Sequence, residues 1–160
     1  MKYKAIFVLI IGIDRYESEY IPSLTGAVAD ARALKTYLVD HLGASEDRIA
    51  ILENKAATRA GIIRGFEHLS SDPRLQIGDP ILVFYAGYGS QAVTSSGCSP
   101  AASVKNIQVI LPYDVLCKVN GKVVEPIPNC TLRAFLDDLA QEKGNNITFI
   151  LDTCHSTFGT

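Results

Sequence analysis

Apolar residues follow two alternating patterns along this chain of 160 residues. Short continuous apolar runs, such as the one from Ile147 to Leu151, are typical of strands buried on both faces of a parallel sheet. Longer segments repeat apolar residues at helical spacing, as Val28, Ala31 and Leu34 do, and this predicts helices packed on the sheet. The predicted strands are 5–11, 48–52, 81–85, 107–111 and 147–151, and the predicted helices lie within 25–42, 58–73 and 131–144.

Residues at the ends of these segments support the predicted boundaries. Thr58 and Thr131 can each cap the N-terminus of a helix. Gly43 and Gly144 stand where helix C-caps belong. The Asn-Gly pair within 118–123 indicates a hairpin turn.

The alternation of strands and helices predicts an α/β fold, with a parallel sheet and helices on both faces, in a single domain spanning 1–160. In such sheets the ligand crevice lies outside the carboxyl ends of the strands. Tyr88 and Cys154 each follow the end of a predicted strand, so both are expected at that edge. The segment 90–103 is too rich in Ser, Gly and Pro for a regular element, and we expect a functional or mobile loop there.

Composition and charge narrow the class of protein. Hydrophobic residues make up 48% of the chain and charged residues 20%, which is an ordinary globular composition. The net charge is −2 and no basic stripe is present, which argues against a nucleic-acid partner. No apolar run approaches the roughly 18 residues that a membrane span needs. The apolar start is predicted to be a buried strand rather than a secretory signal, because Asp14 and Arg15 follow it directly.

The four cysteines, Cys98, Cys117, Cys130 and Cys154, lie far apart and form no Cys-x-x-Cys pair. A zinc site or a dense disulfide framework is therefore not expected. We expect free thiols in a reducing compartment, and hence a cytoplasmic protein.

Cys154 is the candidate nucleophile, and a cysteine nucleophile needs a base or a positive local field because it reacts as a thiolate. His155 is poorly placed as that base, since neighbouring side chains in an extended segment point to opposite faces. His41 and His68 fall at the ends of predicted helices and are expected to face solvent. The residues alone therefore supply a nucleophile without an identifiable base.

Four short motifs occur in order along the chain. They are Ile-Gly-Ile at 11–13, Leu-Thr-Gly-Ala-Val-Ala-Asp-Ala at 24–31, Tyr-Ala-Gly-Tyr-Gly-Ser at 85–90 and Asp-Thr-Cys-His-Ser at 152–156. The third resembles the Tyr-x-Gly-His-Gly-Ser loop of the caspase-like cysteine peptidases (peptidase C14), and the fourth resembles their Asp-x-Cys-His-Ser-Gly loop in its metacaspase form. The first two resemble the metacaspase opening, Leu-x-Gly-Cys-x-Asn-Asp-Ala. The resemblance covers essentially the whole chain and implies the large-subunit-like portion of a caspase-like fold.

The resemblance implies a role for each matching position. Cys154 is the nucleophile, and Tyr88 stands where the catalytic histidine should be. The backbone N–H groups of Gly89 and Cys154 would form the oxyanion hole. Asp30 and Asp152 would form an acidic pocket for Arg or Lys before the scissile bond. Plainer alternatives are a buried thiol for Cys154, a packing aromatic for Tyr88, a helix-terminus acid for Asp30 and a turn acid for Asp152.

The chain also departs from the family pattern. Ala27 replaces a cysteine, Ala29 replaces an asparagine and Thr157 replaces a glycine. The chain stops at Thr160, six residues after Cys154, so the family's smaller C-terminal half is absent from it. That absence leaves the last predicted strand near an unpaired edge. A partner within or between molecules would have to supply the missing half.

Calcium is a possible cofactor by resemblance, because many metacaspases need it. No acidic cluster in the sequence can be assigned to a calcium site, and no other metal site is predicted.

Two functional hypotheses follow. In the first, the chain is a metacaspase-like cysteine endopeptidase that cleaves protein or peptide substrates after basic residues, impaired because Tyr88 replaces the histidine. A phenol titrates near ~10 and is a poor acceptor for the thiol proton. In the second, the chain is a catalytically dead pseudopeptidase that acts as a binding or regulatory module in cell-death or immune-type signalling.

Overall fold

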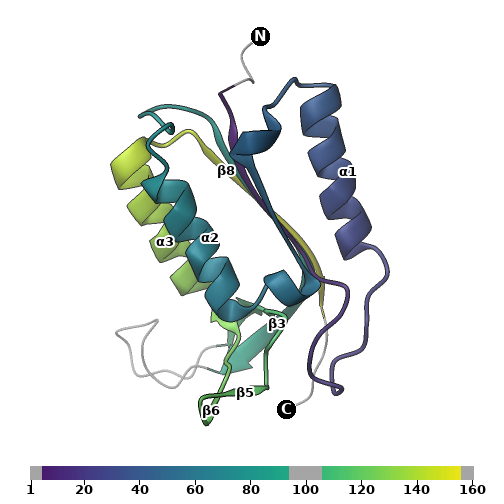
Figure 1. The fold of residues 1–160 in the computed structure, drawn as a ribbon. Coiled ribbons are helices and arrows are strands. Elements are labelled where there is room, and N and C mark those ends of the chain that lie inside the picture. The colour runs from purple at the N-terminus through teal and green to yellow at the C-terminus, as the bar shows by residue number, and fades with distance from the viewer. Residues whose placement is uncertain (1–4, 94–105, 156–160) are drawn as a thin grey trace.

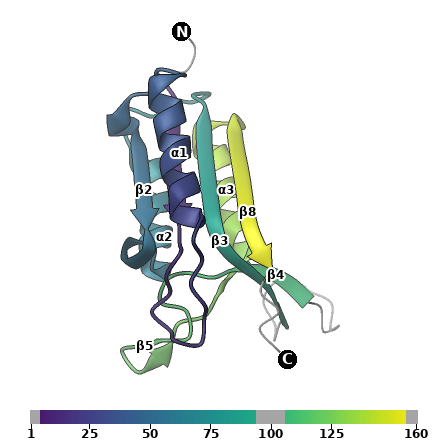
Figure 2. The ribbon, with the colours of Figure 1, turned by 90° about the vertical axis from the view of Figure 1, so that its right-hand side faces the viewer.

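The computed structural model describes residues 5–93 and 106–155, and the side chains of Val93, Cys154 and His155 lie outside that description. A twisted central sheet carries α1 on one face and α2 and α3 on the other (Figures 1 and 2). The helices are α1 (Ala27–Asp40), α2 (Arg59–Ser71) and α3 (Asn129–Lys143), with short 3-10 turns at Glu46–Arg48 and Asn54–Ala56. The strands are β1 (Phe7–Gly12), β2 (Ile49–Glu53), β3 (Ile81–Val93), β4 (Asn106–Ile110), β5 (Lys118–Val119), β6 (Lys122–Val123), β7 (Ile127–Pro128) and β8 (Ile147–His155).

The sheet is mixed and rich in parallel pairs, which confirms the expected α/β fold with helices on both faces. Its strand order is β2-β1-β3-β4-β7, and β8 pairs with β3. Strands β1, β2, β3 and β8 run parallel, whereas β4 is antiparallel to both β3 and β7. The antiparallel part arises because β3 is long enough to pair with β4 beyond its parallel pairing with β1 and β8. Its first part pairs with β8, and from Gly89 onward it forms an antiparallel ribbon with β4.

Two strands extend further than their apolar runs predicted. Strand β3 continues through Tyr85 to Val93, so the start of the expected loop at 90–103 is strand, and 94–103 lies outside the described residues. Strand β8 continues through Asp152 to His155. Glycines and polar residues lower strand propensity, but pairing partners on both sides of β3 override that local preference.

Most predicted boundaries of the shorter elements are confirmed. The Thr58 hydroxyl accepts a hydrogen bond from the Gly61 N–H at 3.0 Å and caps α2. Gly144 ends α3 with a φ of 92°. Asn120 and Gly121 form the hairpin turn with positive φ angles of 50° and 79°.

Two helix ends differ in detail. Helix α3 begins at Asn129 after Pro128, so the predicted cap at Thr131 is wrong. A proline disfavours the helical conformation in the residue before it, so Ile127 stays extended in β7 and the helix begins directly after Pro128. Helix α1 ends at Asp40, and Gly43 follows with a φ of 68° and donates its N–H to the Val39 carbonyl.

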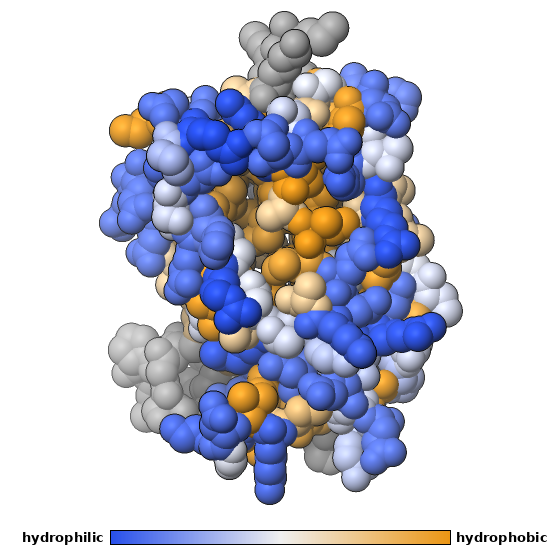
Figure 3. Space-filling model, viewed as in Figure 1, coloured by the Kyte–Doolittle hydropathy of each residue, from blue (hydrophilic) through white to orange (hydrophobic). Residues whose placement is uncertain are grey.

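The continuous apolar runs are explained by a sheet that is buried on both faces. In β1, Phe7, Leu9 and Ile11 pack toward α2 and α3, while Val8 and Ile10 pack toward α1. All five are at most 2% exposed, and each buried side chain of this size contributes about 1.5–3 kcal/mol. Figure 3 shows apolar surface between the two helix layers, where the edge strand β2 lies.

A third, smaller apolar cluster lies past the carboxyl ends of the central strands. It consists of Ile21, Val109, Leu111 and Val115. Tyr16, Tyr88 and Ala92 pack against it. None of the helices within the described ranges is long and apolar enough to cross a bilayer.

Candidate functional site

Tyr88 and Cys154 lie side by side in the backbone register of two neighbouring strands. In the parallel pair β3 and β8, Tyr88 is the partner of Cys154, and Ala86 is the partner of Asp152. Both positions lie near the carboxyl ends of the parallel strands, as predicted, but within strands rather than in loops. The side chain of Cys154 lies outside the described residues, so its role as a nucleophile stays a prediction.

The structure places Tyr88 in a cluster of three tyrosines. The Tyr88 N–H donates to the Tyr16 hydroxyl at 2.8 Å, and the two rings lie 5.6 Å apart with a tilt of 38°. Tyr85 is fully buried, and its hydroxyl lies 2.8 Å from the Tyr88 carbonyl and 3.0 Å from the Leu111 carbonyl. The Leu111 N–H also donates to the Tyr88 carbonyl, at 3.0 Å. The backbone of Tyr88 is therefore fixed at both its N–H and its carbonyl.

Neither neighbouring phenol of this cluster can act as a base at neutral pH. Burial raises the pKa of Tyr16 to about 12, although the hydrogen bond from the Tyr88 backbone opposes the rise. Burial also raises the pKa of Tyr85 well above its ordinary value. Both hydroxyls are therefore neutral and serve as hydrogen-bonding groups that position the backbone, because a group must release its proton near the working pH to act as a base.

The glycines on either side of Tyr88 are required by close packing. A methyl group on Gly87 would lie 2.7 Å from the Tyr85 hydroxyl and 3.1 Å from the Tyr16 hydroxyl. A methyl group on Gly89 would lie 3.0 Å from the Thr153 Cβ on β8. Gly89 is in register with both His155 on β8 and Ile110 on β4. Its backbone role in an oxyanion hole stays a prediction.

The two histidines with described side chains lie at the opposite edge of the sheet. His41 follows the end of α1, and His68 lies in the last turn of α2; both are exposed, as expected. Helix α1 begins near the carboxyl end of β1, where a methyl group on Gly12 would lie 2.7 Å from the Ala31 Cβ. From there its 14 residues carry the chain about 20 Å away from the site. Both imidazoles therefore lie at the end of the sheet opposite to Tyr88 and the backbone of Cys154.

The two predicted pocket acids are both exposed at the carboxyl edge of the sheet, where Tyr88 lies beside Cys154. Asp30 lies in the first turn of α1, and Asp152 lies on β8. Among the described residues, neither carboxylate forms an ion pair with a basic side chain. Both acids are therefore accessible to a cationic ligand, and their joint role as a pocket stays a prediction.

Sequence reasoning missed three residues that build the site. Tyr16 lies 72 positions from its partner Tyr88 in the chain. Asp14 accepts the Ala27 N–H at 2.8 Å and so holds the start of α1. The Asn54 side chain accepts the N–H of Asp14 at 3.0 Å and ties the loop after β1 to the loop after β2. Of these three residues only Asp14 has a local signal, as an acid directly after the first predicted strand. Tyr16 and Asn54 belong to no periodic pattern.

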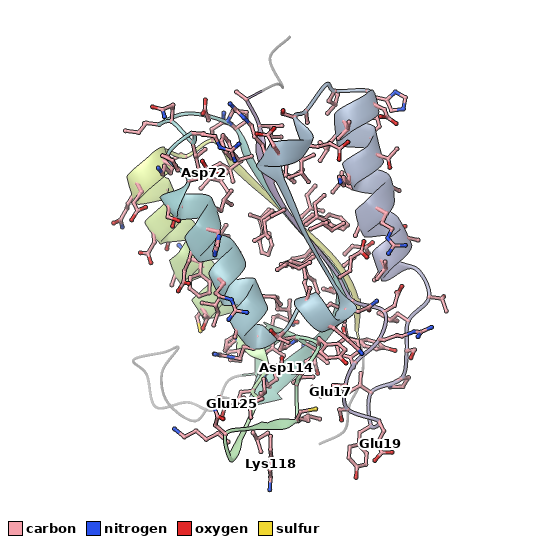
Figure 4. All side chains as sticks on the ribbon, in the orientation of Figure 1. Glu17, Glu19, Asp72, Asp114, Lys118 and Glu125 are labelled. Atoms are coloured by element: carbon pink, nitrogen blue, oxygen red, sulfur yellow. The ribbon has the colours of Figure 1, made fainter. Side chains whose placement is uncertain are left out.

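The cysteines differ from the expectation of free thiols. Cys117 is free and half-buried. Burial raises the pKa of its thiol, and the nearby carboxylates of Glu17 and Asp114 raise it further (Figure 4), so the thiolate form of Cys117 is disfavoured at neutral pH. Cys130 is disulfide-bonded, so the expectation of a free thiol is wrong there. Proximity of cysteines distant in sequence cannot be inferred from spacing alone. Cys98 lies outside the described residues.

Metal ligands do not cluster in the described part of the chain. No group of three or more His, Cys, Asp or Glu side chains there could hold a metal ion. Since calcium takes six to eight oxygen ligands, the described residues do not fit a calcium site.

Comparison with known proteins places these observations in a family. Residues 4–159 match the family described as metacaspase, peptidase C14 domain. The chain is 30% identical over 154 residues to metacaspase-1 of Debaryomyces hansenii and 25% identical over 154 residues to metacaspase-1 of Eremothecium gossypii. Each alignment covers 92% of this chain but 32% and 31% of those proteins, so the chain spans about a third of their length.

A solved structure supports the fold. A protein from Geobacter sulfurreducens superimposes with a TM-score of 0.67 at 21% identity, over 97% of this chain and 52% of that one. The mixed sheet, its flanking helices and the family match agree with a caspase-like α/β fold. The chain belongs to the metacaspase family of caspase-like peptidases (peptidase C14) and forms a cysteine-peptidase-like domain.

Proposed function

We propose that this domain cleaves peptides after Arg or Lys through the Cys154 thiolate, at a rate reduced because Tyr88 occupies the position of the catalytic histidine. The observation that carries the proposal is the register of β3 and β8, which sets Tyr88 beside Cys154. The substrates are proteins or peptides, in keeping with a peptidase family.

The predicted impairment follows from proton transfer. An ordinary cysteine titrates near ~8.5, so only a few per cent is thiolate at pH 7. The thiol proton needs an acceptor, and the phenols of the partly buried Tyr16 and the fully buried Tyr85 are neutral. A positioned general base is typically worth about 10²–10⁴ in rate. We therefore expect slow turnover that relies on the intrinsic nucleophilicity of the sulfur.

The preference for basic residues rests on Asp30 and Asp152. Both carboxylates are exposed at the carboxyl edge, and neither is paired with a cation among the described residues. Two carboxylates facing one guanidinium or ammonium group provide charge-assisted hydrogen bonds. We expect Asp152→Asn to raise KM for Arg-ended reporters with a smaller effect on kcat.

The first test is hydrolysis of Arg- and Lys-ended peptide reporters by the native chain and by Tyr88→His. We expect slow cleavage by the native chain, an increase of about 10²–10⁴-fold in Tyr88→His, and loss of both in Cys154→Ala. Efficient native cleavage that Tyr88→His fails to raise would show that another group is the base. If neither protein cleaves while both are folded, the same pair is measured in a chain of the length of the curated relatives. Absence of reporter cleavage by that longer chain, with and without Tyr88→His, would overturn the endopeptidase proposal.

A pseudopeptidase is the second candidate, and the tyrosine cluster favours it. Tyr16 and Tyr85 fix the Tyr88 backbone with neutral hydroxyls, an arrangement suited to holding a surface rather than to moving protons. In this case the domain binds basic peptides as a regulatory module in cell-death or immune-type signalling. Binding of Arg- or Lys-ended peptides without cleavage, and no labelling of Cys154 by an Arg-directed electrophile, would favour it over the endopeptidase.

The outer edge of β8 is the proposed attachment point for the remaining part of the peptidase fold. Within the described residues β8 pairs with β3 alone, and Ile150 and Leu151 are 41% and 49% exposed. An exposed apolar strand at a sheet edge is a template for further strands. We propose that a segment of the same chain or of a second molecule adds strands there.

A further inference from the structure

A small apolar cavity opens on β3 immediately beyond Tyr88. Its volume is about 150 Å³. The third apolar cluster forms its floor, and side chains from the loop after β1 and from the loop after β4 form its walls. The lining includes Ile21, Ser90, Ala92, Leu111, Leu116 and Pro126.

The cavity lies on the opposite side of the candidate nucleophile from the pocket acids. Side chains two residues apart on a strand share a face, so Tyr88, Ser90 and Ala92 follow one another along the same side of β3. Asp152 is in register with Ala86, two residues before Tyr88, whereas the cavity begins two residues after it. Each step of two residues is about 7 Å. A peptide that runs along β3 past Cys154 therefore has Asp152 on one side of the attacked position and the cavity on the other.

The cavity is the size of one side chain. Drug-sized ligands occupy sites of roughly 300–1,000 Å³, about two to seven times larger. An apolar cavity of about 150 Å³ is known to hold a benzene ring in another protein. The cavity therefore suits one leucine, methionine or phenylalanine side chain rather than a cofactor.

The rim of the cavity presents apolar side chains to solvent. Tyr20 is 77% exposed and Leu116 is 54% exposed. Leu116 also has a φ of 65°, in the left-handed region, and its N–H donates to the Val124 carbonyl at 2.9 Å. A non-glycine residue in this conformation costs about 1–2 kcal/mol. A leucine that is more than half exposed and held in a strained conformation at the mouth of an apolar cavity gains only part of the stabilisation that full burial would give, which points to a function in binding.

We propose that this cavity is a subsite for an aliphatic or aromatic side chain on the leaving-group side of the scissile bond, with Leu116 and Tyr20 as its walls. The inference rests on the proposed function for its orientation, since it assumes that a basic residue lies at Asp30 and Asp152. It adds a second specificity determinant: peptides with a basic residue followed by a large apolar residue are preferred over peptides with glycine at the following positions.

The test measures binding rather than turnover, so that it does not depend on an active catalyst. The full 160-residue chain carrying Cys154→Ala is titrated with blocked peptides that share one arginine and differ in the next two residues, Leu-Leu, Phe-Phe or Gly-Gly, by calorimetry. We expect the Leu and Phe peptides to bind about tenfold tighter than the Gly peptide, which corresponds to ~1.4 kcal/mol. Methyl NMR signals of Leu111 and Leu116 should shift with the Leu peptide and stay unchanged with the Gly peptide.

Two variants keep the proposal falsifiable if one of them disturbs folding. Ala92→Phe fills the cavity and should abolish the preference for Leu over Gly. Leu116→Gly removes one wall and the strained φ together, so it should abolish most of the preference while leaving the urea midpoint equal or higher. A purely structural leucine would instead lower the midpoint. Ile77→Ala, an 82% exposed apolar residue before β3 at the opposite edge, is the matched control and should change neither quantity.

Equal binding of the three peptides, no binding by any of them, or an unchanged preference in both cavity variants would overturn the subsite. NMR contacts between the cavity and another segment of the same chain, together with equal binding of the peptides, would show that the chain itself occupies it. A retained preference for Leu together with silent Arg reporters in the hydrolysis test would leave the subsite standing and reject the endopeptidase. Cleavage of the Arg reporters together with equal binding of the three peptides would reject the subsite and leave the endopeptidase standing.

Discussion

The parallel strands begin at one end of the sheet, the amino edge, and finish at the other, the carboxyl edge. These two ends are held together by different kinds of interaction. At the amino edge, Arg74 pairs with the carboxylates of Asp72 and Asp47. The guanidinium groups of Arg48 and Arg74 also lie over the Phe7 ring, at 4.7 and 5.9 Å from its centre. At the carboxyl edge, the neutral hydroxyls of Tyr16 and Tyr85 bind backbone groups of β3 and of the loop after β4.

This difference shows where the fold needs precise geometry. Exposed ion pairs tolerate small movements and contribute little individually. Buried hydroxyls fix a backbone in one position, because a misplaced polar group loses its partner and its hydration together. The carboxyl edge, where Tyr88 lies beside Cys154, is therefore the rigid edge.

The largest expected effect comes from crowding the carboxyl edge. Gly87→Ala would place a methyl group 2.7 Å from the Tyr85 hydroxyl. Overpacking of this kind costs about 1–3 kcal/mol of unfolding free energy, measured by urea unfolding. Gly26→Ala is the matched control, because its methyl group would meet nothing closer than Asp30 Oδ2 at 3.7 Å. Equal destabilisation in the two variants would mean that the tyrosine cluster is loosely packed.

An intermediate effect is expected at alkaline pH. Burial raises the pKa of Tyr16 to about 12, whereas a tyrosine in the unfolded chain titrates near 10. The unfolded state therefore loses its proton first, and the stability that is fully present below pH 10 is lost as the pH rises toward 12. The loss should reach about 1 kcal/mol by pH 11.

Tyr16→Phe isolates this contribution, because it removes the titrating group and leaves the ring. The variant should be less stable than the native chain at pH 7, and the difference should shrink between pH 9 and 11 in urea unfolding. Tyr37→Phe, which changes a tyrosine that is 52% exposed on α1, serves as the control. Parallel curves for Tyr16→Phe and the native chain would show that Tyr16 has no part in the alkaline loss.

The sequence predicted the elements of the fold better than the geometry of the site. Buried strands have a local signal, since both faces of β1 are apolar, and the Thr58 cap and the Asn120-Gly121 turn depend on chemistry within a few residues. The ends of the predicted strands placed Tyr88 and Cys154 at one edge for the same reason. The extension of β3 to Val93 could not be predicted, because its glycines are required by contacts with Tyr85 and with Thr153 on β8. The partnership of Tyr16 with Tyr88 joins residues 72 positions apart, and no local pattern encodes it.

The smallest expected effect comes from the amino edge in acid. Hydrogen bonds from the Arg74 side chain and backbone lower the pKa of Asp72 to about 2, below the value near 3.9 of an unfolded aspartate. The unfolded state therefore binds a proton first, and the stability that Asp72 supplies above pH 4 is lost as the pH falls toward 2. Asp72→Asn and Arg74→Gln should each flatten this part of the curve of unfolding free energy against pH. Neither should change the alkaline part, because Tyr16 lies at the other edge. A change in the alkaline part by either variant would show that the two edges are energetically coupled, and the contrast between an adaptable ionic edge and a rigid neutral edge would then fail.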